Sequence, residues 1–173
     1  KVGIIDDQIN LPATITEEEL LTKIDELNND VSVHGILVQM PLPKHINEAN
    51  IIEAINRQKD ADGFHAYNVG KVFLSKNSEY LSPCTPKGVI KILEFYNINP
   101  EGKEVVIVGR SNIVGKPLAA MLINRSATVT VCHSKTKDLK FHTLRADILI
   151  AAIGKAKLIT EYMVKKCVVV IDV

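Results

Sequence analysis

The chain of 173 residues carries 21 Lys and Arg against 20 Asp and Glu, and 46% of its residues are hydrophobic. This apolar content is enough for a buried core, and a net charge of +1 gives no reason to propose a nucleic-acid or membrane partner. No apolar run approaches the length of a transmembrane helix.

The cysteines and histidines bear on compartment and metal binding. Cys84, Cys132 and Cys167 are odd in number and show no C-x-x-C spacing. This pattern favours a reduced compartment such as the cytoplasm over a disulfide framework. The five histidines have no close ligand spacing, so we expect no metal site.

The two ends of the chain are unusual. It begins at Lys1 without an initiator Met, and it stops inside an apolar run, 168–173, that predicts a core strand. A sheet strand that ended a native protein without a following turn and helix would be uncommon. We therefore expect further residues on both sides.

The first part of the chain predicts helices around one strand. Thr16 and Glu19 have the spacing of a capping box, and apolar residues at helical intervals behind them predict a helix over 16–28. The run 33–40 predicts a strand, and Asn47 is placed to cap a second helix.

A polar loop through 60–65 follows, and Thr85-Pro86 opens a third helix that reaches about Asn97. The remaining elements alternate regularly: strand 104–109, helix 115–124, strand 127–132, helix 137–145, strand 147–152, helix 159–166 and strand 168–172. Strands that alternate with helices imply an α/β fold with a parallel sheet. The break near 82–85 predicts two α/β lobes, residues 1–85 and 86–173.

A glycine-bounded turn follows the first strand of the second lobe. The β-branched run 105–108 predicts a buried parallel strand, and Gly109 and Gly115 bracket the turn before a helix that admits Pro117 in its first turn. Free N–H groups and the helix dipole make such a turn a site for a dinucleotide pyrophosphate. The spacing is not G-x-G-x-x-G, so an ordinary strand-to-helix turn is the alternative.

The next strand carries a second nucleotide signal. NAD-binding Rossmann units place an acid after this strand to bind the ribose 2′-hydroxyl, but here the residues 133–136 contain none. Arg110 supplies a guanidinium, Ser134 a hydroxyl and Lys135 a positive charge, all suited to the 2′-phosphate of NADP. The alternative is a solvated polar loop.

Two features of the first lobe point to a substrate. Gln39 stands at the C-terminal end of the predicted strand, where ligands of α/β sheets gather, although it could merely bond nearby backbone. Asp60 and Asp62 share a loop with Gly63, and a carboxylate there could accept two N–H bonds from a flat heterocycle such as a pterin. Capping or Asx-turn roles are the alternative for such a loop.

Together these segments resemble one family, the methylenetetrahydrofolate dehydrogenase/cyclohydrolases. The resemblance covers essentially the whole chain and is carried by five ordered motifs, at residues 34–45, 59–65, 83–88, 108–117 and 127–136. It implies NADP-dependent oxidation of 5,10-methylenetetrahydrofolate, followed by hydrolysis of the methenyl product to 10-formyltetrahydrofolate. It also implies a homodimer and a place in the one-carbon metabolism that feeds purine biosynthesis.

The resemblance also implies roles for individual residues. The folate site would be lined by Val38, Gln39 and Met40, with Gln39 bonded to the catalytic lysine and Asp62 on the pterin edge. The cofactor would be held by Gly109, Arg110, Ser111 and Ser134, while Cys84 and Thr85 would border the cleft near the nicotinamide.

The family's lysine belongs to a Tyr-x-x-x-Lys helix that would precede Lys1, so the catalytic residues expected within this chain are Gln39 and Asp62. Tyr162 and Lys166 have the same spacing, but they fall in the second lobe and we reject them. Two alternatives remain: another two-lobed NADP-dependent dehydrogenase, or a family member that has lost catalysis and only binds folate or nucleotide.

Overall fold

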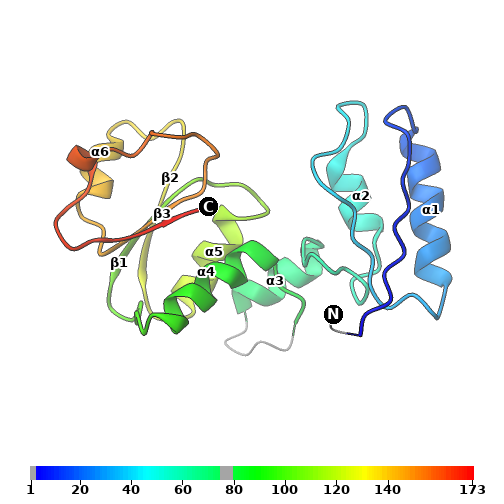
Figure 1. Ribbon diagram of the computed structural model, residues 1–173, viewed down its shortest axis with the longest axis horizontal. Helices are drawn as coiled ribbons and strands as arrows, with labels where there is room; N and C mark the ends of the chain where they lie inside the picture. The colour runs from blue at the N-terminus through cyan, green and yellow to red at the C-terminus, as the bar shows by residue number, and fades with distance from the viewer. Residues whose placement is uncertain (1–2, 75–79) are drawn as a thin grey trace. The chain divides into compact units, whose positions relative to one another are not determined.

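The chain folds as two units, Lys1–Lys59 and Asp60–Val173, in the computed structural model, which describes residues 3–74 and 80–173 (Figure 1). Each unit has a hydrophobic core of its own. Within the described residues, no helix has both the length and the apolar character needed to cross a membrane.

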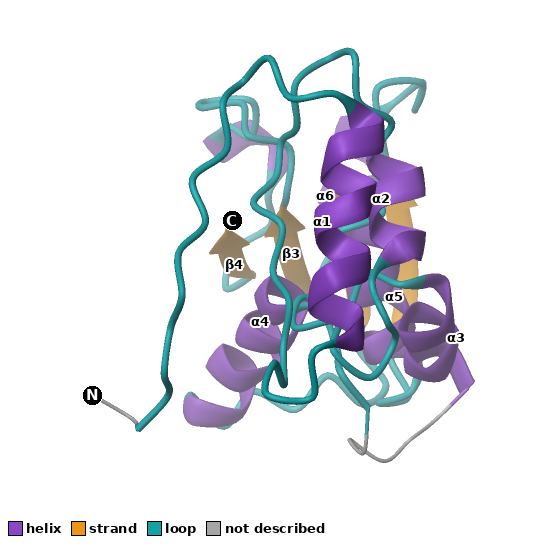
Figure 2. Cartoon of the chain, turned by 90° about the vertical axis from the view of Figure 1, so that its right-hand side faces the viewer, coloured by secondary structure: helices purple, strands orange, loops and turns teal. Residues whose placement is uncertain are grey.

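The first unit is built on two helices, α1 (Glu17–Asn29) and α2 (Glu48–Ala54), which lie side by side (Figures 1 and 2). Both N-termini are capped as predicted. The Thr16 side chain accepts the Glu19 N–H while the Glu19 carboxylate accepts the Thr16 N–H, and Asn47 accepts the Ala49 N–H. Between the helices lies an aliphatic core of Leu20, Ile24, Ile36, Ile46, Ile51 and Ile55.

The strand predicted over 33–40 is wrong. Only Ile36 makes a bridge there: its N–H donates to the Lys59 carbonyl oxygen at 2.7 Å, and the flanking residues are irregular. An apolar run can extend as a strand only where neighbouring backbone pairs with it along its length. The described part of the first unit offers that pairing at one residue.

The second unit carries a parallel sheet of four strands in the order β2-β1-β3-β4. Its elements run in this sequence: α3 (Ala66–Leu74), α4 (Cys84–Phe95), β1 (Glu104–Val108), α5 (Gly115–Ile123), β2 (Thr128–Cys132), α6 (Leu139–Thr143), β3 (Ile148–Ala151), the 3-10 turn η1 (Glu161–Met163) and β4 (Val169–Asp172). The α/β class and the four strands of the second lobe are thus confirmed.

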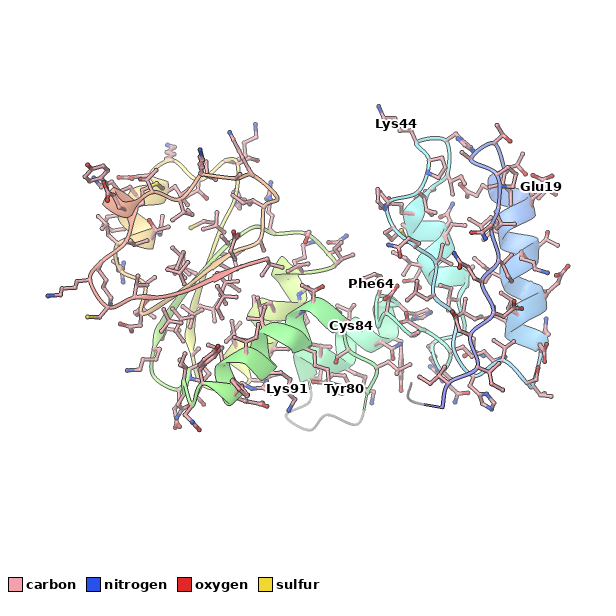
Figure 3. All side chains as sticks on the ribbon, viewed as in Figure 1. Glu19, Lys44, Phe64, Tyr80, Cys84 and Lys91 are labelled. Carbon is pink, nitrogen blue, oxygen red and sulfur yellow. The ribbon has the colours of Figure 1, made fainter. Side chains whose placement is uncertain are left out.

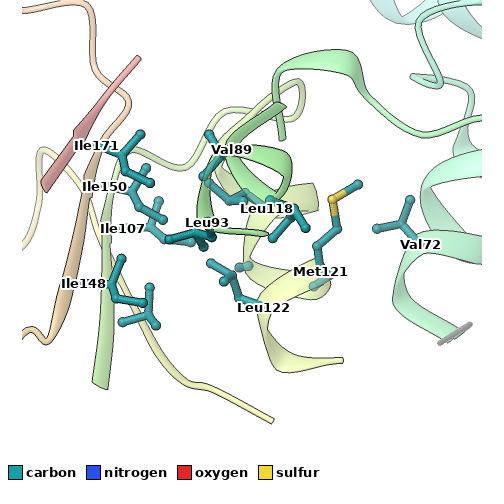
Figure 4. Packing of buried hydrophobic residues seen from close by; sticks show 14 residues of the cluster. Val72, Val89, Leu93, Ile107, Leu118, Met121, Leu122, Ile148, Ile150 and Ile171 are labelled. Carbon is teal, nitrogen blue, oxygen red and sulfur yellow. The ribbon is translucent and has the colours of Figure 1, made fainter. Parts of the chain in front are cut away.

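The two faces of this sheet are covered by different elements. Ile107, Ile150 and Ile171 point toward α4 and α5, where they meet Leu93 and Leu118 (Figure 4). The alternate strand residues, including Val106, Val108 and Leu149, pack on the other face against residues of the α6 side. Burial on both faces explains the unbroken apolar runs of β1 and β3.

The sequence did not predict the helix α3, and the helix predicted over 159–166 does not form. The sequence gives no Ser, Thr or Asn cap before α3 and places Gly70 inside it, yet Val72 anchors the helix in the main core. The helix predicted over 159–166 is wrong, because only the single turn η1 forms there. Its Tyr162 is 73% exposed, so no apolar stripe holds a longer helix against the sheet.

The units divide after Lys59, whereas the sequence predicts a lobe boundary at 85. The difference arises because α3 packs with α5, as the bond from the Asn124 side chain to the Val72 carbonyl shows at 2.7 Å. Compactness therefore assigns the Asp62 loop to the unit that contains the sheet. The division of roles between residues 1–85 and 86–173 remains a prediction.

Candidate functional site

The turn between β1 and α5 is closed by its two glycines. Gly109 has φ +134°, and a Cβ there would collide with the Ala152 carbonyl oxygen. A Cβ at Gly115 would collide with the Gly109 carbonyl oxygen. Both positions therefore require glycine, and the backbone of the turn is left bare for a ligand to approach closely.

Ser111 shapes the same turn. Its hydroxyl oxygen accepts the Val114 N–H at 3.1 Å and the Gly115 N–H at 3.4 Å, which caps the start of α5. Because a hydroxyl also carries a proton, Ser111 can still donate to an anionic oxygen placed at the turn. The sequence predicts Ser111 as a cofactor residue but does not predict this capping role.

The turns after β1 and β2 begin from paired residues. Val108 is the register partner of Cys132, and the Gly109 N–H donates to the Cys132 carbonyl at 2.9 Å. Arg110 and Ser134 each stand two residues beyond that pair, at the same carboxyl edge of the sheet. Both are exposed, and no described residue forms an ion pair with the Arg110 guanidinium. Its charge is therefore free to meet a phosphate.

Gln39 lies in the irregular segment after Ile36. Its amide Nε2 donates to the Met40 carbonyl at 3.0 Å, which is the backbone bond that the sequence left as the alternative reading. Val38 is half-buried against the core of the first unit, while Gln39 is exposed. The amide oxygen of Gln39 remains available as an acceptor.

Lys59 organises the first unit in a way that the sequence did not reveal. Its ammonium donates to the carbonyls of Leu27, Asn28 and Asp30 at 2.9, 2.7 and 2.7 Å, at the C-terminal end of α1. Its own carbonyl accepts the Ile36 N–H. Lys59 thus ties the segment that leads to Gln39 to the end of α1. These partners lie 23 to 32 positions away in sequence, so no local sequence pattern predicts the contacts.

Asp60 and Asp62 have separate tasks. Asp60 is only 2% exposed, and its carboxylate accepts the N–H groups of Phe64 and His65 and the Asn68 amide at 3.2, 2.9 and 2.7 Å. This is the capping role that the sequence left open for the loop. Asp60 therefore holds the start of α3, and its carboxylate is buried among donors of the protein itself.

Asp62 is the carboxylate of the loop that remains available. It is half-buried, and burial, followed by the neighbouring negative charge of Asp60, raises the pKa of the Asp62 carboxyl above its ordinary value. A positively polarised N–H edge placed against Asp62 would relieve both effects. A ligand that donates hydrogen bonds to the Asp62 carboxylate would therefore be favoured electrostatically.

Gly63 brings this loop to the start of α4. It has φ +69°, and a Cβ there would lie 2.6 Å from the Ser82 carbonyl carbon and 2.9 Å from the Pro83 nitrogen. The Asp62 loop therefore packs directly on Ser82 and Pro83, the residues before Cys84, which Figure 3 labels at the start of α4. Within the second unit, the loop of Asp62 packs at Gly63 against Ser82 and Pro83, and Arg110 and Ser134 follow paired strands at the same edge of the sheet.

Across residues 3–74 and 80–173, no three His, Cys, Asp or Glu side chains gather in a way that could hold a metal ion. The three cysteines are free thiols, with Cys84 and Cys167 exposed and Cys132 buried.

Comparison with known proteins identifies both halves of the chain. The model of the tetrahydrofolate dehydrogenase/cyclohydrolase catalytic domain matches residues 1–62. The model of the NAD(P)-binding domain of the same family matches residues 83–173, more than half of the chain.

Individual proteins of the same family are similar to this chain over most of its length. The "Bifunctional protein FolD" of Dechloromonas aromatica is 57% identical over 172 residues, which are 99% of this chain and 60% of that protein. The crystal structure of the FolD enzyme from Campylobacter jejuni is 53% identical, with a TM-score of 0.88 over 91% of this chain and 56% of that one. The Trypanosoma brucei FolD, solved with NADP cofactor and inhibitor, is 36% identical, with a TM-score of 0.85 over 90% of this chain and 53% of that one.

The chain spans about 60% of the length of the curated relatives that it matches. Its glycine turn and parallel sheet fall within the residues matched by the NAD(P)-binding-domain model, and Asp62 is the last residue matched by the catalytic-domain model. The chain therefore belongs to the tetrahydrofolate dehydrogenase/cyclohydrolase family.

Proposed function

We propose that the protein is a bifunctional one-carbon folate enzyme. It oxidises 5,10-methylenetetrahydrofolate to the 5,10-methenyl cation, and water then adds to that carbon to give 10-formyltetrahydrofolate and a proton. The observation that carries the proposal is that the catalytic-domain and NAD(P)-binding-domain models of one family both match this single chain. Relatives named as bifunctional, at 57% and 58% identity, support it.

The second unit supplies the cofactor site in this proposal. NADP, when bound, supplies the acceptor for the hydride that leaves the methylene carbon. The bare backbone at Gly109 and Gly115 leaves room for the phosphates, and Ser111 donates its hydroxyl proton to them. Arg110 and Ser134 hold the 2′-phosphate, which is favoured because no acid follows β2. The NADP complex of the Trypanosoma brucei relative supports this choice.

The folate is bound by Asp62 and by residues 38–40 in this proposal. Asp62 accepts the N–H groups of the pterin edge, consistent with a half-buried carboxylate whose pKa is raised by burial. Val38 and Met40 line the folate site with Gln39. Gln39 orients the amine of the family's catalytic lysine, which would hold and release protons at the folate nitrogen and the attacking water.

The wider setting follows from the same proposal. Its substrates and products are tetrahydrofolate derivatives, and 10-formyltetrahydrofolate is a one-carbon donor for purine biosynthesis. The three free thiols favour the cytoplasm. We further propose a homodimer, by analogy with the family.

The experiment is an assay of the complete natural protein. With 5,10-methylenetetrahydrofolate and NADP, we expect NADPH to form, and with methenyltetrahydrofolate we expect its near-ultraviolet absorbance to disappear faster than in buffer. Tight folate binding without either reaction would overturn the proposal and indicate a binding protein. NADP reduction without hydrolysis would restrict it to the dehydrogenase.

A further inference from the structure

The four-residue turn after β2 is locked by hydrogen bonds among its own members. The His133 N–H donates to the Thr136 hydroxyl at 2.9 Å, and the Thr136 N–H donates to the His133 carbonyl at 2.9 Å. The Lys135 N–H donates to Nδ1 of the His133 ring at 3.1 Å. Ser134 lies between these contacts and is exposed. The position of Ser134 is therefore set by its neighbours.

The His133 ring does here what an Asn or Asp side chain does in an Asx turn. Nδ1 is separated from Cα by the same number of bonds as Oδ1 of asparagine, and both accept the N–H of the residue two positions on. His65 makes the same contact with the Tyr67 N–H at 3.1 Å. An accepting Nδ1 carries no hydrogen of its own, as Oδ1 of asparagine carries none.

Thr136 anchors the turn to the sheet. Burial raises the pKa of the Cys132 thiol, and a hydrogen bond with the Thr136 side chain opposes this. Cys132 is itself the register partner of Val108, whose chain leads into Arg110. The turn is thus held at its base by the same pair of strands that places Arg110.

The position of His133 in the chain relates this turn to cofactor binding. It follows directly on β2, where NAD-binding units place the acid that bonds the ribose hydroxyls. An Asp there would cap the turn equally well, but its negative charge would meet the 2′-phosphate. Histidine forms the turn without that charge.

We propose that His133 is a positioning residue for recognition of the cofactor's 2′-phosphate, because it accepts the Lys135 N–H and so fixes the turn that presents Ser134. The inference rests on the NADP-dependent function proposed above. In this proposal His133 does not contact the cofactor. What the position requires is an acceptor atom for the Lys135 N–H, and not an imidazole ring as such.

The test compares 2′,5′-ADP with 5′-AMP, two probes that differ only in the 2′-phosphate, by calorimetric titration of the complete natural protein. Three variants separate acceptor from charge: His133→Asn keeps a neutral acceptor, His133→Asp keeps an acceptor and adds charge, and His133→Phe removes the acceptor. Thr136→Val and Thr136→Ser repeat the comparison at the other end of the turn. His142→Phe, on α6, is the matched control.

The preference for 2′,5′-ADP should stay within about threefold of wild type in His133→Asn, Thr136→Ser and His142→Phe, since no contact to the phosphate is lost. In His133→Phe and Thr136→Val it should fall by about tenfold, the scale for one hydrogen bond to a charged group. In His133→Asp it should fall by about 100-fold, because like charges would then face each other. Affinity for 5′-AMP should change little throughout.

The outcomes separate the two proposals. A wild-type protein that binds both probes equally would overturn the NADP assignment itself. A wild-type preference that survives in His133→Phe would overturn the role of His133 and leave the proposed function standing, whatever the charge of His133→Asp does. A loss in His133→Asn as large as in His133→Phe would also overturn it, since the imidazole itself would then be required. Where His133→Phe fails to fold, the comparison of Thr136→Val with Thr136→Ser decides whether a fixed turn is required, since Thr136→Val removes the bond to the His133 N–H and leaves the ring in place.

Discussion

Asp60 and Asp62 show how two identical side chains, two positions apart, take on different tasks. Asp60 is buried and its oxygens are satisfied by backbone and Asn68, so it belongs to the structure. Asp62 is half-buried and carries a raised pKa because of burial and the Asp60 charge. Substitutions at the two positions should therefore be distinguishable by what they damage.

Asp62→Ala in the complete natural protein should weaken folate binding by about 1.5–3 kcal/mol, the range for hydrogen bonds to charged groups. The nucleotide site should keep its affinity, since the turns at Gly109 and His133 are untouched. Calorimetry with tetrahydrofolate and with 2′,5′-ADP measures both. Unchanged folate affinity would show that Asp62 does not hold the pterin.

Asp60→Ala is the matched comparison. It should lower the free energy of unfolding by about 3 kcal/mol, because it leaves donors of the backbone and of Asn68 without their acceptor. A variant as stable as wild type would contradict the capping role of Asp60.

At the scale of elements, single polar side chains join the ends of segments whose middles pack in the hydrophobic core. Lys59 ties the end of α1 to the segment that carries Gln39. At the opposite edge of the sheet from the nucleotide turns, Asp147 joins the starts of β1 and β3. We expect that replacing either side chain, Lys59 or Asp147, lowers the stability of the segments it joins.

Lys59→Met keeps the length of the side chain but removes its three bonds to carbonyl oxygens. We expect the first unit to lose about 2 kcal/mol of stability, since a charged donor is replaced by an apolar group. Hydrogen exchange of the α1 and α2 amides should accelerate, while the amides of β1 and β3 stay protected. Lys44→Met, at an exposed position in the same unit (Figure 3), is the control. Equal exchange in both variants would refute the role of Lys59.

Asp147 should make the sheet sensitive to acid. The hydrogen bond from Lys165, at 2.6 Å, and that from the Glu104 N–H hold the pKa of its carboxyl below the ordinary value. A lowered pKa means that the ionised form stabilises the fold at neutral pH, and this contribution is lost as the pH falls through the lowered pKa. Denaturant unfolding should find Asp147→Asn less stable than wild type at pH 7, with the gap closing in acid.

Asp25→Asn, on the exposed surface of α1, is the control for that experiment and should follow the wild-type pH profile. A gap between Asp147→Asn and wild type that does not depend on pH would mean that the carboxylate charge contributes nothing to the sheet.

The molecule as a whole consists of two units whose main hydrophobic clusters differ in size. Among the described residues, the first unit buries six aliphatic side chains between two helices, whereas the main cluster of the second unit holds 14 buried residues around a sheet. Because stability grows with the apolar area removed from water, the first unit should be the weaker one.

We therefore expect residues 1–173 to unfold in two steps, with α1 and α2 losing hydrogen-exchange protection at a lower temperature than β1 and β3. Saturating 2′,5′-ADP should raise only the upper step, since a ligand stabilises the unit that binds it. Hydrogen exchange followed by mass spectrometry along a temperature ramp distinguishes the two. A single transition shifted as a whole by the ligand would show that the units unfold together.

The sequence alone determined the features that depend on near neighbours in the chain. The capping box at Thr16 and the cap at Asn47 are contacts within a few residues, and the four strands and the glycine turn at 109–115 are marked by apolar runs and by glycine spacing. These interactions form wherever the segment forms, so pattern and spacing are enough to predict them.

Tertiary structure decided the rest, because it depends on partners far away in sequence. The run 33–40 has the composition of a strand but finds one backbone partner, and 159–166 has helical spacing but no surface that holds a helix. The division of tasks between Asp60 and Asp62 was settled by Asn68 and the start of α3, and the reach of Lys59 to α1 crosses about 30 positions. Composition records which groups a segment carries, and only the folded chain determines which of them meet.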